Sequence, residues 1–171
     1  MSKAFHKVKA IFLWIDRAIE VFAVSSVALM TLIVTLQVIT RKLFNFVFFW
    51  SEEVTLLLLV WFSFLGIAIG FRDKLHLAMD ALANRFSKRV NWLLDRIIAL
   101  CTLLFGIYLM KYGWDFVQVV KNNTMSATGW SSAVKYIIMP VTGILTIFYG
   151  LLQLLGIDTV QHRELDEGVS E

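Results

Sequence analysis

The sequence has few of the residue types on which soluble enzymes and small secreted domains depend. Its 171 residues include one cysteine, one proline, three histidines and 17% charged residues, whereas soluble domains contain about 25% charged residues. The single cysteine, Cys101, excludes a disulfide framework and a cysteine-based zinc site. One proline and nine glycines exclude collagen-like and low-complexity sequence. The low charge argues against an ordinary soluble enzyme, a disordered chain and a coiled coil.

Apolar residues are abundant instead. When glycine is counted and tyrosine is left out, about 61% of the chain is apolar, against roughly 45–50% in soluble domains. These residues gather in four runs without charge, at 21–40, 54–71, 97–110 and 136–157. A helix needs about 20 mostly apolar residues to cross a bilayer, and three of the runs meet that length directly. The third run is short, but its helical pattern extends over 92–114 and has a tryptophan at each end, as membrane interfaces favour.

We therefore expect an all-α integral membrane protein. Its single domain, at 18–157, should contain four transmembrane helices, at about 18–40, 51–71, 92–114 and 136–157. In the alternative, the third segment lies on the membrane surface and the C-terminus lies on the opposite side. Eleven lysines and arginines fall in the N-terminal segment, the second connection and the tail, and four fall in the other two connections. Because basic connections stay in the cytoplasm, both termini are expected there.

Two further segments are amphipathic. Residues 1–17 and 75–90 place apolar side chains at helical spacing with polar and basic residues between them, which predicts helices in the interface plane on the cytoplasmic side. They either anchor the chain to lipid or brace a partner protein. The aromatic stretch 43–50 is too short to cross, so it should lie in the opposite interface or cover a neighbouring protein. The acidic tail, 158–171, is expected to be solvated in the cytoplasm.

Catalytic constellations are missing from the spans. His6, His76 and His162 lie outside them, which excludes haem ligation by paired histidines inside the bundle, and no phosphate-binding loop or dinucleotide motif is present. We expect no enzymatic activity, no cofactor, no bound metal and no nucleic-acid partner. The deep parts of the spans carry no ionisable residue, although such residues normally mark an ion or solute path. The chain should therefore serve a larger assembly; the alternative is a small autonomous transporter or channel that forms homo-oligomers.

Two pairs of residues are candidates for contacts. Glu52 and Glu53 open the second span, where the helix dipole favours acids; alternatively, one of them pairs with Arg41 or Lys42, or with a basic group of a partner. Gly66 and Gly70 form a GxxxG pattern, which permits a close approach of a second helix. That second helix could belong to a partner or to the chain itself.

The stretch 41–80 resembles the small membrane subunit of tripartite ATP-independent periplasmic (TRAP) transporters. The matching residues are Arg41 after the first span, Trp50-Ser51-Glu52-Glu53 at the start of the second, Trp61 through Leu65-Gly66 within it, and His76-Leu77-Ala78-Met79-Asp80 after it. In that family a W-x-E-E opening, a later F-L-G and an H-I/L-x-x-D ending recur in this order. The four-span layout with cytoplasmic ends extends the likeness over most of the chain.

The resemblance implies an accessory subunit in the bacterial inner membrane. It would pack on a large many-span subunit that carries the solute and sodium sites, and a periplasmic solute-binding protein would deliver an organic acid such as sialic acid or a C4-dicarboxylate. Besides lipid, those two proteins are the expected partners. The residues expected to form interface or structural contacts, none of them catalytic, are Arg41, Trp50, Glu52, Glu53, Gly66, Gly70, His76 and Asp80.

Overall fold

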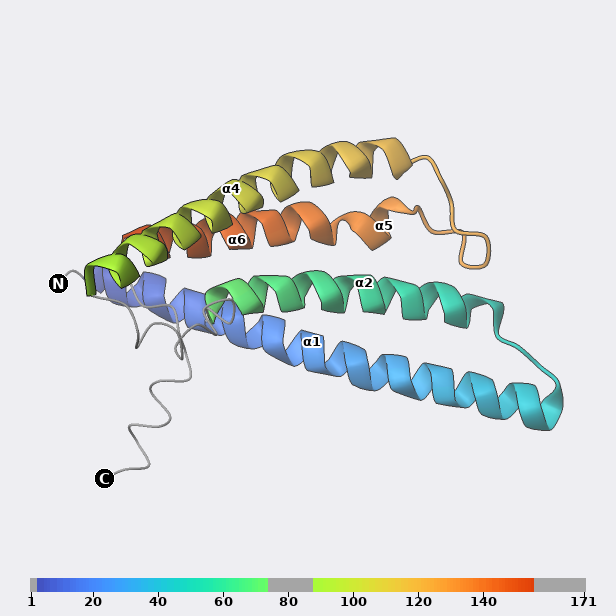
Figure 1. Ribbon diagram of the computed structural model, residues 1–171. Coiled ribbons are helices and arrows are strands. Elements are labelled where there is room, and N and C mark those ends of the chain that lie inside the picture. The colour runs from blue at the N-terminus through green and yellow to red at the C-terminus, as the bar shows by residue number, and fades with distance from the viewer. Residues whose placement is uncertain (1–2, 74–87, 156–171) are drawn as a thin grey trace, which may run out of the picture.

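Long helices dominate the described part of the chain. The computed structural model describes residues 3–73 and 88–155, with side chains described over 16–73 and 89–155. The helices are α1 (Lys3–Phe44), α2 (Phe49–Arg72), α4 (Lys88–Val120), α5 (Ala133–Tyr136) and α6 (Ile138–Leu154) (Figure 1). Four stretches are long and apolar enough to cross a membrane: Asp16–Phe44, Phe49–Arg72, Arg89–Val120 and Ala133–Leu154. The prediction of an all-α protein with four membrane-crossing helices is confirmed.

The third span is a continuous helix. α4 has 33 residues, which rise about 50 Å at 1.5 Å per residue, more than the roughly 30 Å of a hydrocarbon core. The segment is therefore long enough to cross, as the four-span prediction requires. The N-terminal residues 3–17 continue into the first span without a break, as one helix of 42 residues. Most of the predicted interfacial helix, at 75–87, and the predicted tail, at 158–171, lie outside the described residues.

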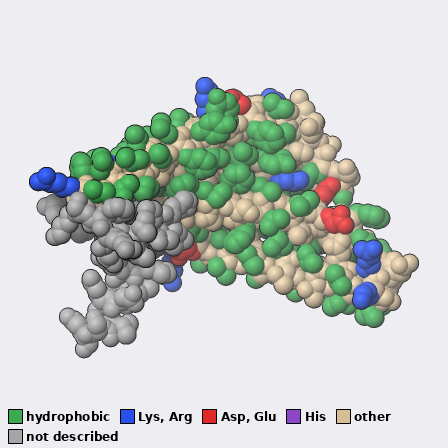
Figure 2. Space-filling model, in the orientation of Figure 1, with side chains coloured by type: hydrophobic (Ala, Val, Ile, Leu, Met, Phe, Trp, Pro, Cys, Tyr) green, Lys and Arg blue, Asp and Glu red, His purple; other side chains and the backbone are tan. Residues whose placement is uncertain are grey.

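The four long helices pack as a row. α2 lies between α1 and α6, and α4 lies along the other side of α6 (Figure 1). We call the end that holds the start of α4 and the ends of α2 and α6 the proximal end. The distal end holds the α1–α2 turn and the α4–α5 loop. Because a row buries fewer side chains than a closed bundle, large apolar residues are exposed along every long helix (Figure 2). Lipid is the natural environment for such a surface.

Glycines set the closest helix contact, between α4 and α6. A β-carbon placed on Gly143 would lie 2.5 Å from the amide nitrogen of Met110, and one on Gly106 would lie 2.7 Å from that of Ile147. Gly113 and Gly150 are similarly tight, at 3.0 Å and 3.1 Å from the nearest backbone atoms. Each helix therefore carries two glycines seven residues apart at the shared contact. Small residues let the backbones of membrane helices approach closely, where dispersion attraction is strongest.

Two features of the backbone have a local cause. α1 ends at Phe44, and Asn45 follows with a φ of 51°, a left-handed conformation that asparagine tolerates better than most residues. The break between α5 and α6 falls at Ile137, three residues before the only proline, Pro140. Pro140 has no N–H to donate to the carbonyl of Tyr136, so regular helix hydrogen bonding is interrupted there.

Candidate functional site

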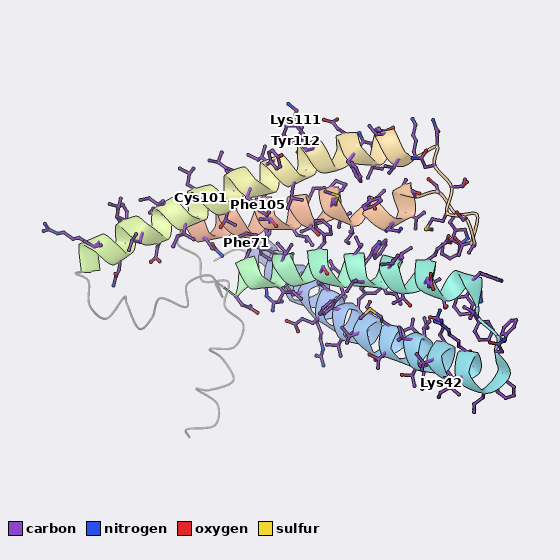
Figure 3. The ribbon with its side chains drawn as sticks, turned by 45° about the vertical axis from the view of Figure 1, so that its right-hand side comes forward. Lys42, Phe71, Cys101, Phe105, Lys111 and Tyr112 are labelled. Carbon is purple, nitrogen blue, oxygen red and sulfur yellow. The ribbon has the colours of Figure 1, made fainter. Side chains whose placement is uncertain are left out.

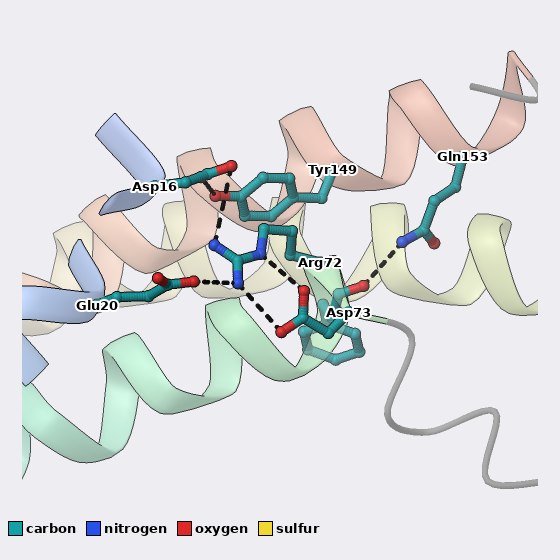
Figure 4. A network of polar contacts seen from close by, with 7 residues as sticks. Asp16, Glu20, Arg72, Asp73, Tyr149 and Gln153 are labelled. Carbon is teal, nitrogen blue, oxygen red and sulfur yellow. Dashed lines mark hydrogen bonds and ion pairs between the residues drawn. The ribbon is translucent and has the colours of Figure 1, made fainter. Parts of the chain in front are cut away.

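The largest polar network of the described residues lies at the proximal end. Its centre is Arg72, the last residue of α2, whose side chain is 2% exposed. The guanidinium donates to Asp73, with 2.9 Å from Nε to Oδ1, and to Glu20 of α1, with 2.5 Å from Nη2 to Oε1 (Figure 4). Asp16, one turn before Glu20, lies 3.8 Å from Nη1. One buried cation thus joins the end of α2 to two acids on α1.

α6 closes the same network from the other side of α2. The hydroxyl of Tyr149 donates to Oδ1 of Asp16 at 2.5 Å, and the amide of Gln153 donates to the carbonyl oxygen of Phe71 at 2.7 Å (Figure 4). Tyr149 and Asp16 are both buried. Because Tyr149 and Gln153 are one turn apart, they share a face of α6. The network therefore fixes three helices at one end of the row.

The local sequence explains why these groups meet. Asp16 and Glu20 are spaced i, i+4, so both point from one face of α1, and Arg72 follows directly on the apolar run of α2. A buried arginine needs hydrogen-bonded acids, because an isolated buried charge is very costly. The planar guanidinium offers five donors in a fixed fork, which lets it bind several carboxylates at once. The arrangement holds three helices together.

A second contact orders the distal end. Both carboxylate oxygens of Glu53 accept hydrogen bonds from the α4–α5 loop: Oε1 from the amide of Ala127 at 2.8 Å, and Oε2 from the amide and the hydroxyl of Thr128 at 2.9 Å and 2.8 Å. The loop is itself a narrow turn, in which Thr124 pairs with Ser131 and the amide of Met125 donates to Trp130 at 2.8 Å. The start of α2 thus holds a loop that lies about 75 positions later in the chain.

A third contact joins α2 to α5 between these two ends. The indole Nε1 of Trp61 donates to the carbonyl oxygen of Val134 at 3.1 Å, and its ring lies 5.7 Å from that of Phe22 on α1. Trp61 is partly buried. A tryptophan in an apolar interior normally finds an acceptor for its N–H, and here that acceptor is a carbonyl of the short helix α5. Trp61 therefore packs against α1 on one side and binds the α5 backbone on the other.

The structure separates the residues predicted as a contact group. Glu53 is partly buried in the loop contact, while Glu52, Trp50 and Arg41 are exposed. Within the described residues, neither Arg41 nor Lys42 forms an ion pair with Glu52 or Glu53; the loop amides take that place for Glu53.

The two glycines of the GxxxG pattern also differ. Gly66 is exposed, and a β-carbon placed on it would meet no atom within 4 Å, whereas Gly70 is buried. Gly66 therefore makes no close helix contact within this chain. The last two predicted contact residues, His76 and Asp80, lie outside the described residues.

Sequence reasoning missed the proximal network. Arg72 counts among the cytoplasmic charges that set orientation, and it is also the most buried charged side chain described. The available signal was the pair Asp16 and Glu20, one helical turn apart immediately before the first uncharged run. Acids next to a span, facing an arginine at the end of the next span, are candidates for a pair across the helix hairpin. For the Glu53 contact there was no comparable signal, because its donors are backbone amides.

Comparison with known proteins identifies the family. A family model described as "Tripartite ATP-independent periplasmic transporters, DctQ component" matches residues 30–159. The chain belongs to this family. The DctQ match covers the last three spans and about half of the first, Asp16–Phe44, so it extends beyond the 41–80 stretch that carries the motifs. The resemblance to TRAP small membrane subunits is confirmed, and the family is one of transporter subunits, not of enzymes.

Three relatives illustrate the range of transporter proteins to which this chain is similar. A Haemophilus influenzae protein assigned to the TRAP small permeases is 27% identical over 132 residues, 77% of this chain and 82% of its own. The C4-dicarboxylate TRAP transporter small permease protein DctQ of Vibrio cholerae is 31% identical over 87 residues, 51% of this chain and 38% of its own. The sialic acid TRAP transporter permease protein SiaT of H. influenzae is 30% identical over 73 residues, 40% of this chain and 12% of its own.

Proposed function

We propose that this DctQ component is the accessory subunit of a sodium-coupled TRAP transporter that imports an organic acid across the bacterial inner membrane. It packs on the large permease as a fixed scaffold and does not itself hold the solute. The large permease carries the solute and sodium sites, and a periplasmic binding protein delivers the solute. Sialic acid and C4-dicarboxylates are the first solute classes to test, because the names of two relatives contain them.

The observation that carries the scaffold role is the open side of α2. Although α2 lies in the middle of the row, Leu56, Leu59, Ser63 and Gly66 are all exposed. Their spacing of three and four residues places them on one face, which we call the α2 stripe. Gly66 has open space around it, so another helix can approach closely there. The relative SiaT supports a large permease as the partner. A segment similar to this chain forms 12% of that permease, so in SiaT the two parts belong to one chain.

The charge pattern supports the absence of a solute path in this subunit. The uncharged runs 21–40, 54–71, 97–110 and 136–154 make up the middle of the four spans. The described charges collect toward the proximal and distal ends, with Lys111 nine residues, or about two and a half turns, before the end of α4. Since ionisable groups within a membrane usually mark ion or solute paths, the solute and sodium sites belong in the large subunit.

Reconstitution tests the function directly. We expect sodium-driven uptake in proteoliposomes only when this chain, its large permease and the binding protein are all present, and the solute panel should include a sialic acid and a C4-dicarboxylate. If this chain alone drives uptake as fast as the full set, the accessory role is wrong. Uptake by the large permease and binding protein at an undiminished rate without this chain would contradict it equally.

The α2 stripe has its own test. Gly66→Leu adds a side chain where this chain has open space, so the subunit should fold normally while co-purification with the large permease falls. Leu104→Phe, on the exposed face of α4, is the matched control and should leave co-purification unchanged. Normal co-purification and uptake with Gly66→Leu would show that the large permease does not bind at this stripe.

A further inference from the structure

The tip of the α1–α2 hairpin, residues 41–50, is the most exposed apolar feature at the distal end. The exposed fractions of Leu43, Phe44 and Phe49 are 72%, 73% and 81%. The rings of the tip also contact one another: Phe46 meets Phe48 edge-on at 5.0 Å, and Phe48 lies 5.7 Å from Trp50. A group of aromatic side chains fixed in this way and facing outward is typical of the boundary between hydrocarbon and headgroups.

Two neighbouring cations precede these rings in the chain. Arg41 and Lys42 occupy the last turn of α1 and are both exposed, and Lys42 lies near the distal end of that helix (Figure 3). Over the described residues, no acid lies within ion-pair distance of either one. The negative end of the α1 dipole favours cations at this position, but that effect is partial and screened. The tip therefore combines aromatic surface with two positive charges for which the described part of the chain supplies no counter-charge.

The depth of these cations can be read along α1. Arg41 lies 21 residues after Glu20, which belongs to the proximal network. At 1.5 Å per residue this is about 32 Å, close to the roughly 30 Å thickness of the hydrocarbon core. When the proximal network lies at one membrane surface, Arg41 and Lys42 lie at the level of the phosphates of the opposite leaflet. A helix tilt of about 20° changes this depth by only about 2 Å.

We propose that the hairpin tip is a binding site for an anionic phospholipid of the distal leaflet, such as phosphatidylglycerol. The guanidinium of Arg41 and the ammonium of Lys42 bind the phosphodiester. The planar guanidinium can donate to its oxygens through two N–H groups, and the compact ammonium can donate to them as well. Phe44, Phe49 and Trp50 contact the glycerol backbone and the first acyl carbons. This inference requires only that the hairpin crosses the membrane, so it does not depend on which partner the subunit has.

Native mass spectrometry of the full chain tests the site. The chain is released from nanodiscs that contain equal amounts of phosphatidylglycerol and phosphatidylcholine with the same acyl chains, and the retained lipids are counted. We expect the wild type to retain phosphatidylglycerol preferentially. In the double variant Arg41→Gln/Lys42→Gln the preference should fall about fivefold for each charge removed. The exchanged variant Arg41→Lys/Lys42→Arg should keep it.

Lys121→Gln provides the matched control. Lys121 is another exposed cation of the distal end, but it belongs to the α4–α5 hairpin, where it donates to Gln118 at 3.0 Å. This variant should retain phosphatidylglycerol like the wild type. If the double variant Arg41→Gln/Lys42→Gln retains as much phosphatidylglycerol as the wild type, the proposal is overturned. It is also overturned if Lys121→Gln loses as much of the preference as the double variant, because that result would show a general effect of charge. An assembled transporter in which the double variant loses the large permease and keeps its lipid preference would assign the tip to protein contact, and would overturn it as well.

Discussion

At the scale of single residues, Arg72 shows why charge at the end of a span can be structural. Its guanidinium is buried among Asp16, Glu20 and Asp73, so each acid depends on the same cation. Removal of one partner from a buried group of charges leaves the others without compensation, and this loss exceeds the net stabilisation by the intact group. The free energy of unfolding should therefore fall more when the cation is removed than when a neutral member of the network is removed.

Arg72→Met should destabilise the subunit by about 3 kcal/mol, the lower end of the range for breaking a buried ion pair. Tyr149→Phe removes one hydrogen bond to a carboxylate and should cost about 1.5–3 kcal/mol. Thermal unfolding in one detergent, followed by circular dichroism, compares the two. Arg17→Met, at an exposed position of α1, is the control and should unfold like the wild type. Equal unfolding temperatures for Arg72→Met and Arg17→Met would contradict a stabilising network.

Glu53 and Glu52 are neighbours with different environments, which allows a direct comparison. Glu53→Gln keeps the shape of the side chain but replaces one acceptor oxygen by a donor, so it cannot receive all three bonds from Ala127 and Thr128. We expect faster amide hydrogen exchange across the α4–α5 loop in this variant and unchanged exchange in Glu52→Gln. If the loop exchanges at the same rate in both variants, the Glu53 contact does not hold it.

At the scale of elements, the four glycines of α4 and α6 determine which helices pack most closely. Gly143→Ala would place a methyl group 2.5 Å from a backbone nitrogen of α4, which the helices can relieve only by moving apart. A cost of about 1–3 kcal/mol is typical of overpacking. Gly66→Ala meets open space, and it should be neutral or stabilising because alanine favours helix over glycine by about 0.5–1 kcal/mol. The unfolding temperature should fall for Gly143→Ala and stay the same or rise for Gly66→Ala. Equal destabilisation by the two variants would contradict this account.

The same elements show what the sequence could predict. Each uncharged run of about 20 residues must be helical in lipid, because its backbone groups have no other partners there, so the fold class and three of the spans followed from the hydropathy pattern. The third run has only 14 residues, and its span followed from the helical pattern over 92–114. The pairing of helices did not. The GxxxG pattern of Gly66 and Gly70 was the candidate for a close helix contact, while the seven-residue pairs Gly106/Gly113 and Gly143/Gly150 make that contact within the chain.

The contact residues were harder to predict for a physical reason. Glu52 and Glu53 look equivalent in sequence, and only the tertiary fold brings the amides of Ala127 and Thr128 to one of them. Arg72 is ambiguous in a similar way, because an arginine after an apolar run is normally a solvated topology signal. Its burial depends on where α1 and α6 place their acids and tyrosine. Motif spacing along 41–80 nevertheless pointed to the DctQ family, which the match over 30–159 confirms.

At the scale of the whole molecule, the row of helices gives the subunit two broad sides and two different ends. The proximal end is tied together by ion pairs between α1 and α2 and by hydrogen bonds from α6, whereas the distal end carries the aromatic hairpin tip and the loop held by Glu53. In a subunit built in this way, the helices are fixed to one another at the proximal end. Surfaces for contact lie along its side and at the distal end. The proposed scaffold role requires such contact surfaces, and it also requires a defined orientation in the membrane.

Orientation is therefore the property to measure. Eleven lysines and arginines belong to the N-terminal segment, the second connection and the tail, against four in the other two connections, and basic connections remain in the cytoplasm. In a Cys101→Ser background, Ser126→Cys in the exposed distal loop should react with a membrane-impermeant maleimide in intact cells. Ser2→Cys and Ser170→Cys should react only after the membrane is opened. Labelling of both terminal cysteines in intact cells would reverse the orientation and move the hairpin tip to the cytoplasmic leaflet, and labelling of only one of them would remove a span.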